Sequence, residues 1–227
     1  MVRPVALSGG RILPVLPPLA PLLPEGGLRR GSVVEVAGRP GATSLALALA
    51  AGASRAGSWV AAVDLWSLGP AAAAQLGVDP ARLALVPDPG SSWGSVAAAL
   101  VDGVELVLLR PRGTVAARDA RRLTARARER GTALVVLLAP GWSGERGAGG
   151  WPEGPDVRLE VVASRWSGVG QGWGHLTGRE VDVAAVGRRA AAAPRRARLR
   201  LPGEGGVEAV EVAEREVQPA ASLAAAR

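Results

Sequence analysis

The sequence lacks cysteine, lysine, phenylalanine and tyrosine, and it contains a single histidine. Without cysteine the chain forms neither a disulfide nor a thiolate metal site, and nothing in it points to secretion. His175 cannot build a metal cluster alone, so we expect no metal site. No apolar run reaches the roughly 18 residues of a membrane-spanning helix, and the apolar N-terminal stretch lacks the pattern of a signal peptide. We therefore expect a cytoplasmic protein that does not bind a membrane.

All 27 basic residues are arginines, and the formal net charge is +7. Because Phe and Tyr are absent, the core has to be built from valine, leucine and alanine with the seven tryptophans. The chain of 227 residues, 48% of them hydrophobic, fits one α/β domain with small additions. Its richness in Ala, Gly, Arg and Pro is typical of a GC-rich genome, which accounts for part of the missing lysine. A drift in codon usage toward GC does not normally remove a catalytic lysine that is under selection.

One stretch organises the chain: a strand over residues 32–37, a glycine-rich turn, and a helix over residues 43–53. This is the geometry of a phosphate-binding loop, in which backbone N–H groups converge on phosphate. The P-loop sequence G-x-x-x-x-G-K-[ST] is not present, because the turn is shorter and no lysine precedes the threonine. Three interpretations stay open: a structural turn, a weak nucleotide or anion site, and a hydrolytic site. The residues of the weak nucleotide site are Gly38, Gly41, Thr43 and Ser44.

The chain then repeats this alternation of strand and helix. We expect further strands over residues 59–64, 83–87, 105–109 and 132–138. We expect helices over residues 70–76, 92–101 and 114–130. Nearly continuous apolar strands between helices predict an α/β fold, a parallel sheet with helices on both faces. Ligands of such sheets bind at the carboxyl ends of the strands, which is where the glycine-rich turn lies.

The two ends of the chain differ from this middle part. Beyond residue 157 the hydrophobicity alternates, which predicts an antiparallel C-terminal extension with strands over residues 157–166, 178–186, 197–201 and 207–212. The prolines of the N-terminal leader forbid a regular helix, and its leucines need cover, so we expect an extended or irregular cap on the domain. We divide the chain into a leader at 1–27, a core at 28–202, and a hairpin and tail at 203–227.

Several runs of the chain resemble the core of the RecA recombinase. WVAAVD (59–64), LGVD (76–79) and VELVLLRP (104–111) correspond to RecA segments in register. VRLEVVASRW (157–166) and GREVDVAAVGRR (178–189) resemble its late strands, including the basic pair after the last one. More narrowly, LPPLAPLLPEGGLRRGSVVEVAG followed by GATSLALALA is similar to the small actinobacterial RecA-like proteins called ImuA′. The resemblance to RecA covers roughly residues 28–189 and implies a RecA-like fold.

The departures from RecA concern the charged parts of its ATPase site. The P-loop lysine maps to Ala42, whereas the Mg²⁺-binding hydroxyl is kept at Thr43. The acid that orients the attacking water maps to Trp66, two residues after Asp64. The Walker B acid is missing, because its strand continues into Arg110. Phosphoryl transfer depends on positioning and charge stabilisation, so we expect no ATPase activity and no cofactor beyond weakly held ATP. We interpret Asp64 as a loop-capping carboxylate. We interpret Trp66 as a packing residue that fills the vacated nucleotide pocket, and a base-stacking platform is the alternative.

Two basic segments and one glycine-rich loop are candidates for contact with DNA. Residues 110–130 hold eight arginines against two acids, and residues 188–200 hold six arginines and no acid. Clustered cations bind phosphate, although a solvated face remains the alternative. The loop at 141–155 corresponds to a DNA-binding loop of RecA, and its tryptophans would stack on bases, unless the loop is a disordered linker. The candidate DNA-binding residues are Arg118, Arg121, Arg122, Arg126, Trp142, Trp151, Arg188 and Arg189.

The resemblance to ImuA′ implies a function. Proteins of that family are accessories of mutagenic translesion synthesis, and they work with ImuB, an inactive Y-family polymerase homologue, and with an error-prone polymerase. We therefore expect a non-catalytic RecA-fold adaptor that binds an ImuB-like partner, with single-stranded DNA as a second partner to be tested. Two alternatives stay open: a DNA-dependent ATPase or recombinase paralogue, and a SulA-like inhibitor of cell division.

Overall fold

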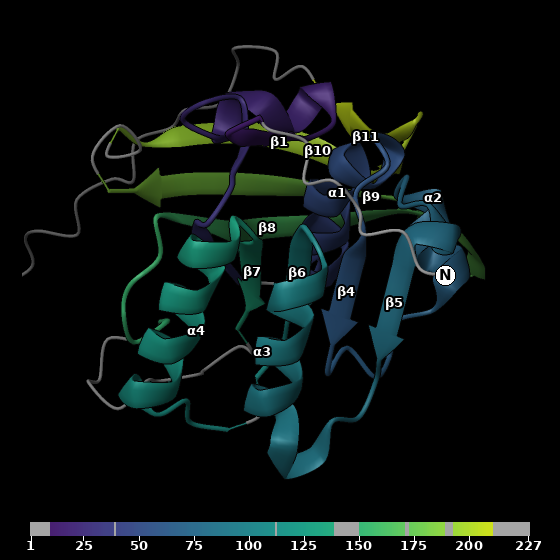
Figure 1. Cartoon of the computed structure of the whole chain (residues 1–227). Helices are drawn as coiled ribbons and strands as arrows, with labels where there is room; N and C mark the ends of the chain where they lie inside the picture. Colours follow the sequence, from purple (N-terminus) through teal and green to yellow (C-terminus); the bar gives the residue numbers. More distant parts are fainter. Residues whose placement is uncertain are drawn as a thin grey trace, which may run out of the picture.

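Figure 1 shows the computed structural model of the chain, which describes residues 10–38, 40–111, 113–138, 150–170, 173–188 and 193–210. The strands of its parallel sheet are β3 (Val33–Gly38), β4 (Val60–Val63), β5 (Leu83–Val86), β6 (Leu106–Leu109), β7 (Ala133–Leu137) and β8 (Val157–Gly170). They run parallel in the spatial order β8-β3-β7-β6-β4-β5. The predicted parallel sheet is confirmed, and the strand that leads into the glycine-rich turn lies inside it rather than at an edge.

Helices cover both faces of this sheet, as predicted. The α-helices are α1 (Ala42–Arg55), α2 (Pro70–Gln75), α3 (Trp93–Gly103) and α4 (Ala117–Arg130), with single 3₁₀ turns η2 (Pro80–Arg82) and η3 (Gly90–Ser92) between them. In Figure 1, α3 and α4 lie side by side in front of the sheet, and α1 lies on its opposite face. Every residue of β4, β6 and β7 is buried, because both faces are covered. No helix in the described part of the chain is long and apolar enough to span a membrane.

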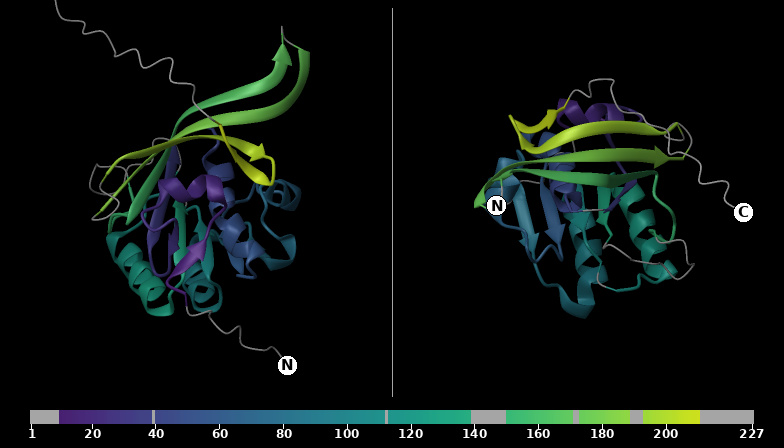
Figure 2. Two further views of the ribbon diagram at one scale, coloured as in Figure 1. Left: turned by 90° about the horizontal axis from the view of Figure 1, so that it is seen from above. Right: turned by 180° about the vertical axis from the view of Figure 1, so that it is seen from behind.

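The C-terminal part of the sheet is antiparallel. It consists of β9 (Trp173–Gly187), β10 (Arg195–Gly203) and β11 (Gly206–Ala209), in the order β8-β9-β10-β11. Figure 2 shows β8 and β9 continuing together as a long ribbon that projects from the body of the molecule. Residues 211–227, most of the predicted tail, lie outside the described residues.

The pairing of β8 differs from the prediction in one respect. We expected an antiparallel strand, but β8 pairs parallel with β3 on one side and antiparallel with β9 on the other. The predicted alternation itself is confirmed, because Val157, Leu159 and Val161 are buried whereas Glu160 and Val162 are exposed. Arg158 stands opposite Glu35 of β3 in the register and forms an ion pair with it, so a charged residue of β8 faces a buried part of the sheet.

The described part of the leader packs onto the α1 face of the core. β1 (Ile12–Pro14) pairs antiparallel with β2 (Gly27–Arg29), and the 3₁₀ helix η1 (Pro17–Leu22) lies between them. This segment, purple in Figure 1, lies against β10 and β11. Its buried leucines are Leu13, Leu16, Leu19, Leu22 and Leu23. The prolines prevent an α-helix but not a compact cap, because η1 starts with Pro17 and contains Pro21.

Candidate functional site

The glycine-rich turn joins β3 to α1, and both of its outer glycines have left-handed backbone angles. The φ angle is 106° at Gly38 and 125° at Gly41, which favours glycine. A β-carbon at Gly38 would lie 2.4 Å from the carbonyl oxygen of Val161, and one at Gly41 would lie 2.9 Å from Cγ1 of Val181. The glycines are therefore required because β8 and β9 pack directly on the turn. This is the structural-turn interpretation, and it needs no phosphate to explain the two glycines.

A guanidinium group occupies the start of α1. Arg179 of β9 donates a hydrogen bond from Nη2 to Oγ of Ser44, with a distance of 2.9 Å. The same guanidinium carbon lies 4.3 Å from the centre of the Trp166 ring, a cation–π distance. Burial lowers the pKa of Arg179 below its ordinary value. An anion at the N-terminus of α1 would thus meet a cation as well as backbone N–H groups, but Arg179 is already hydrogen-bonded there.

The other predicted parts of a nucleotide site follow the carboxyl ends of β4 and β6, parallel strands of the same sheet as β3. Trp66 is 67% exposed, so the prediction that it fills a vacated pocket is wrong. Asp64, at the end of β4, is buried with a left-handed φ of 61°, and its N–H donates to the carbonyl of Val86. Arg110 continues the β6 side of the sheet through a hydrogen bond from its N–H to the carbonyl of Val63. Among the described residues, no group of three His, Cys, Asp or Glu side chains is arranged to hold a metal ion.

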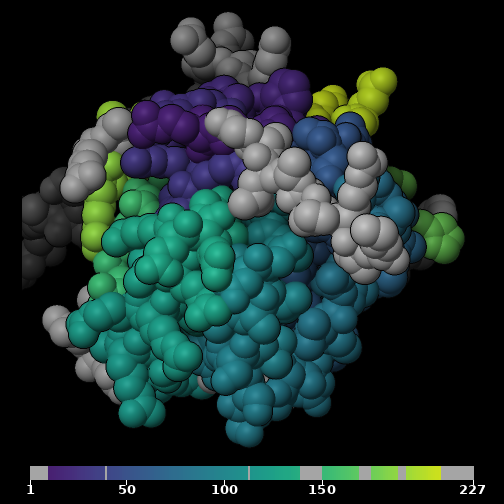
Figure 3. Space-filling model, in the orientation of Figure 1, coloured from purple at the N-terminus to yellow at the C-terminus, as the bar shows by residue number. Residues whose placement is uncertain are grey.

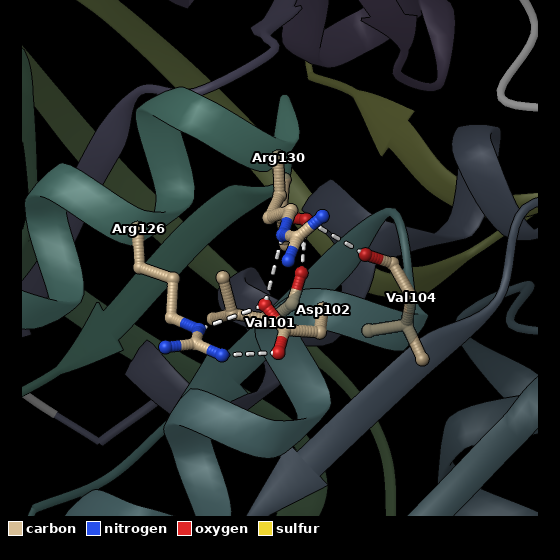
Figure 4. A network of polar contacts seen from close by, with 6 residues as sticks. Val101, Asp102, Val104, Arg126 and Arg130 are labelled. Atoms are coloured by element: carbon tan, nitrogen blue, oxygen red, sulfur yellow. Dashed lines mark hydrogen bonds and ion pairs between the residues drawn. The ribbon is translucent and has the colours of Figure 1, made fainter.

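One candidate DNA-binding arginine, Arg126, forms hydrogen bonds between α4 and α3. Arg126 donates from Nε to Oδ1 of Asp102 over 2.7 Å and from Nη2 to the other carboxylate oxygen. Arg130 donates to the same carboxylate over 3.1 Å. Figure 4 shows both arginines of α4 pointing at Asp102, which lies near the end of α3. The hydrogen bond from Arg126 holds the pKa of Asp102 below its usual value. Arg126 therefore joins α3 to α4 and is not free to meet phosphate.

The remaining candidates on α4 are exposed. Arg118 is 87% exposed with Asp119 at 3.7 Å, and Arg121 lies 3.4 Å from a carboxylate oxygen of Glu153. Arg122 is exposed and forms no ion pair within the described residues. The structure thus leaves a basic surface made of Arg118, Arg121 and Arg122, which we call the α4 basic face. This surface is narrower than the sequence suggested.

The candidate DNA-binding residues outside α4 differ in exposure. Arg188 is exposed and donates to the backbone carbonyl of Glu153 over 3.0 Å, which places it on the same segment as the contact of Arg121. Arg189 and Trp142 lie outside the described residues. Trp151 is 2% exposed, and its indole donates to Oγ1 of Thr124 over 3.0 Å. The prediction that Trp151 stacks on bases is therefore wrong, because its ring belongs to the core between the sheet and α4.

A buried carboxylate that the sequence analysis did not select explains the position of Trp151. Glu35, in the middle of β3, is 0% exposed and accepts the backbone N–H of Trp151 over 2.9 Å. Arg158 of β8 lies 3.1 Å away as its ion partner. Burial raises the pKa of Glu35, although the Trp151 hydrogen bond and Arg158 act in the opposite direction. The available signal was a single acidic residue in an apolar strand, and it gave no indication of these partners.

Comparison with solved structures defines the class of protein. The chain is similar to the crystal structure of the RadB recombinase, with a TM-score of 0.58 and 19% sequence identity, over 82% of this chain and 94% of that chain. At this identity the likeness establishes the fold alone. The protein has a RecA/RadB-like α/β fold, as the sequence resemblance implied.

The family is more specific than the fold. The protein family described as the MT3502 N-terminal domain matches residues 21–144, more than half of the chain. The chain belongs to this family. It is also 43% identical over 97 residues to the uncharacterized protein Rv3395c of Mycobacterium tuberculosis (strain ATCC 25618 / H37Rv). That match covers 42% of this chain and 48% of the relative, so the chain spans about half the length of the curated relative it matches.

Proposed function

We propose that the protein is a non-catalytic RecA-fold adaptor in mutagenic translesion synthesis, which binds an ImuB-like Y-family polymerase homologue. The RecA/RadB-like fold and the sequence resemblance to ImuA′ support this role. The proposal that the protein is not an ATPase is supported by the contacts of the glycine-rich turn. Its glycines are packed against β8 and β9, and Arg179 is hydrogen-bonded to Ser44 where a phosphate would meet α1.

The absence of the charged groups of the RecA ATPase site is expected to make ATP hydrolysis very slow. A phosphoryl-transfer site needs a cation on the transferred phosphate, a Mg²⁺ ion held by a carboxylate, and a group that orients water. Here Ala42, Arg110 and Trp66 stand in those three places, and Trp66 points into solvent rather than into a site. Losing one preorganised donor costs roughly 10²–10³ in rate, so three losses leave little catalysis. We infer that the fold is retained as a scaffold for binding.

The first experiment measures ATP turnover by the purified full chain, with and without single-stranded DNA. We expect no turnover above a buffer blank. Ala42→Lys alone is expected to create none, because the carboxylates are still missing and Arg179 still occupies the start of α1. Turnover by the parent that Thr43→Val abolishes would establish the alternative, a DNA-dependent ATPase.

The second experiment tests the partner. The full chain is co-purified with a Y-family polymerase homologue from the same genome, and the complex is measured by size-exclusion chromatography and by titration calorimetry. We expect a complex that forms without nucleotide and that Thr43→Val leaves unchanged. A chain that elutes separately from the polymerase homologue at micromolar concentrations, with or without ATP and DNA, would contradict the adaptor role.

A further inference from the structure

A cavity of about 550 Å³ lies at the end of the sheet opposite the glycine-rich turn. β3 begins at Val33 and reaches the turn at Gly38, so residues just before and at the start of β3 mark the amino end of the sheet. Ser32, Val34 and Val157, the first residue of β8, line the cavity together with the end of the leader. In Figure 3 the leader (purple) borders the surface of α4 (teal), and Arg128 of α4 completes the lining.

The lining combines arginines with an apolar floor. Its charged residues are Arg29, Arg30, Arg128, Arg188, Glu25 and Asp156, which carry a net charge of +2. The apolar part includes Leu23, Leu28 and Val34, all of them buried. The carboxylate of Asp156 is already engaged, because its Oδ2 accepts the N–H of Val33 over 2.9 Å. Its negative charge remains part of the lining and is included in the net charge of +2.

The arginines reach the cavity from separate parts of the chain. Arg29 ends β2, Arg128 lies in the last turn of α4, and Arg188 follows β9. Arg29 and Arg128 form no ion pair within the described residues. Arg30 also lines the cavity, and its Nε and Nη1 atoms are shielded from solvent. Like charges brought together in this way are stabilised by a bound anion.

We propose that this cavity binds the phosphate group of a small, nucleotide-sized molecule that carries at least two negative charges. Its volume is within the range of small-molecule sites, about 300–1,000 Å³. Guanidinium groups match phosphate oxygens in paired hydrogen bonds, and a terminal phosphate offers three acceptor oxygens to cations that converge from different elements. A dianion would balance the net charge of the lining. The site lies away from the turn at 38–41 and is independent of the adaptor role.

Isothermal titration of inorganic pyrophosphate into the full chain, at fixed ionic strength, tests the proposal. Sulfate and succinate serve as comparison anions. We expect pyrophosphate to bind at least about tenfold more tightly than either, and the double variant Arg29→Gln/Arg128→Gln to lose at least about tenfold in affinity. Both arginines are exposed, so the fold is retained, as circular dichroism would verify. The control Arg165→Gln/Arg196→Gln removes the same charge from exposed positions outside the cavity and should bind like the parent.

Two outcomes would overturn the proposal: pyrophosphate that binds no better than sulfate, or an equal loss in the cavity and control variants. A further arm compares a nucleoside monophosphate with a short oligonucleotide that has or lacks a 5′-phosphate. Competition of the monophosphate with pyrophosphate supports the small-molecule source. If only the 5′-phosphorylated oligonucleotide competes, and does so only in the parent and control, the phosphate chemistry stands and its source is a nucleic-acid end.

Discussion

The two ends of the parallel sheet differ in how much of each is left open. At the carboxyl end, where such sheets usually bind ligands, β8 and β9 pack on the turn at 38–41, and Arg179 is hydrogen-bonded to Ser44. At the amino end, the leader, α4 and the start of β8 surround an arginine-lined cavity. The glycine-rich turn at the usual ligand end is thus covered by the chain itself, whereas a cavity lies at the opposite end.

At the glycine-rich turn, the backbone pattern of a phosphate-binding loop is kept although its contacts have changed. The strand, turn and helix of a phosphate-binding loop are all present, and so is the hydroxyl of Thr43. The glycines now meet strands instead of a ligand, since a side chain at either one would collide with β8 or β9. A strand–Gly-turn–helix pattern therefore predicts the backbone well, but it does not establish that phosphate is bound.

Gly38→Ala should have the largest effect on stability. The new β-carbon would lie 2.4 Å from the carbonyl oxygen of Val161, and the φ of 106° is strained for any L-residue. We expect a loss of about 3 kcal/mol or more in the free energy of unfolding, because strain of about 1–3 kcal/mol adds to the backbone collision. Urea denaturation measures it.

Gly57→Ala is the matched control for this variant. Its φ is 93°, but the space around its β-carbon position is open within 4 Å. The expected loss is about 1–2 kcal/mol, from backbone strain alone. Equal losses for the two variants would mean that β8 does not close the turn, and the contrast between the two ends of the sheet would be lost.

Glu35→Ala should have the next largest effect, because Glu35 holds the segment that leads to the cavity wall. Its removal leaves the buried N–H of Trp151 without an acceptor, which costs about 1–3 kcal/mol. Glu35→Gln keeps a carbonyl oxygen for that N–H and should stay within about 1 kcal/mol of the parent at pH 7. If both variants lose the same stability, the ion pair with Arg158 rather than the hydrogen bond positions Trp151.

The free energy of unfolding of the parent relative to Glu35→Gln should depend on pH, because Glu35 can titrate and glutamine cannot. Burial raises the pKa of Glu35 above its ordinary value of 4.5 in the folded state. A carboxyl with a raised folded pKa contributes stability below its unfolded pKa, and this contribution is lost as the pH rises through the folded pKa. The stability of the parent relative to Glu35→Gln should therefore fall from pH 4 toward neutral pH. A difference that is constant with pH, measured by urea unfolding at several pH values, would contradict the raised pKa.

The arrangement of the core was readable from the sequence because it depends on local patterns. The apolar runs at 105–109 and 132–138 predicted buried parallel strands, and β6 and β7 are buried throughout. The prediction was incomplete where it depended on a distant partner. The alternation in β8 predicted its antiparallel pairing with β9, but not its parallel pairing with β3, which brings Arg158 to Glu35, 123 residues earlier.

The candidate site was less predictable for the same reason. Arg126 and Arg122 look alike in the sequence, and only the packing of α3 against α4 brings Asp102 to the first of them. Trp151 was placed in a mobile loop by its neighbouring glycines, but Thr124 and Glu35 hold it in the core. Trp66 was expected to be buried and is exposed. Composition and spacing identify the residue types, whereas their roles depend on contacts between distant segments.

Arg126→Gln and Arg122→Gln test this distinction on α4. Arg126→Gln should lower the thermal unfolding midpoint, because it removes the hydrogen bonds that join α4 to Asp102. Arg122→Gln, at an exposed position, should leave the midpoint unchanged within error. Asp102→Asn provides a check from the other helix and should resemble Arg126→Gln. Differential scanning calorimetry of the three variants at neutral pH measures the effects, and a parent-like midpoint for Arg126→Gln would mean that the contact is only a surface ion pair.

The smallest effect on stability, and the most informative for function, is expected from the triple variant Arg118→Gln/Arg121→Gln/Arg122→Gln. These arginines form the α4 basic face, and exposed arginines contribute little to stability. If they contact single-stranded DNA, each phosphate contact contributes about −0.7 to the slope of log K against log salt concentration. The triple variant should then flatten the slope by about two units. Arg11→Gln/Arg165→Gln/Arg196→Gln removes the same charge elsewhere on the surface and should change the slope little. If the α4 variant binds DNA as the parent does, the α4 basic face does not contact DNA. Binding of the same variant to the polymerase homologue would then be measured, because an acidic surface on that partner could contact the same three arginines.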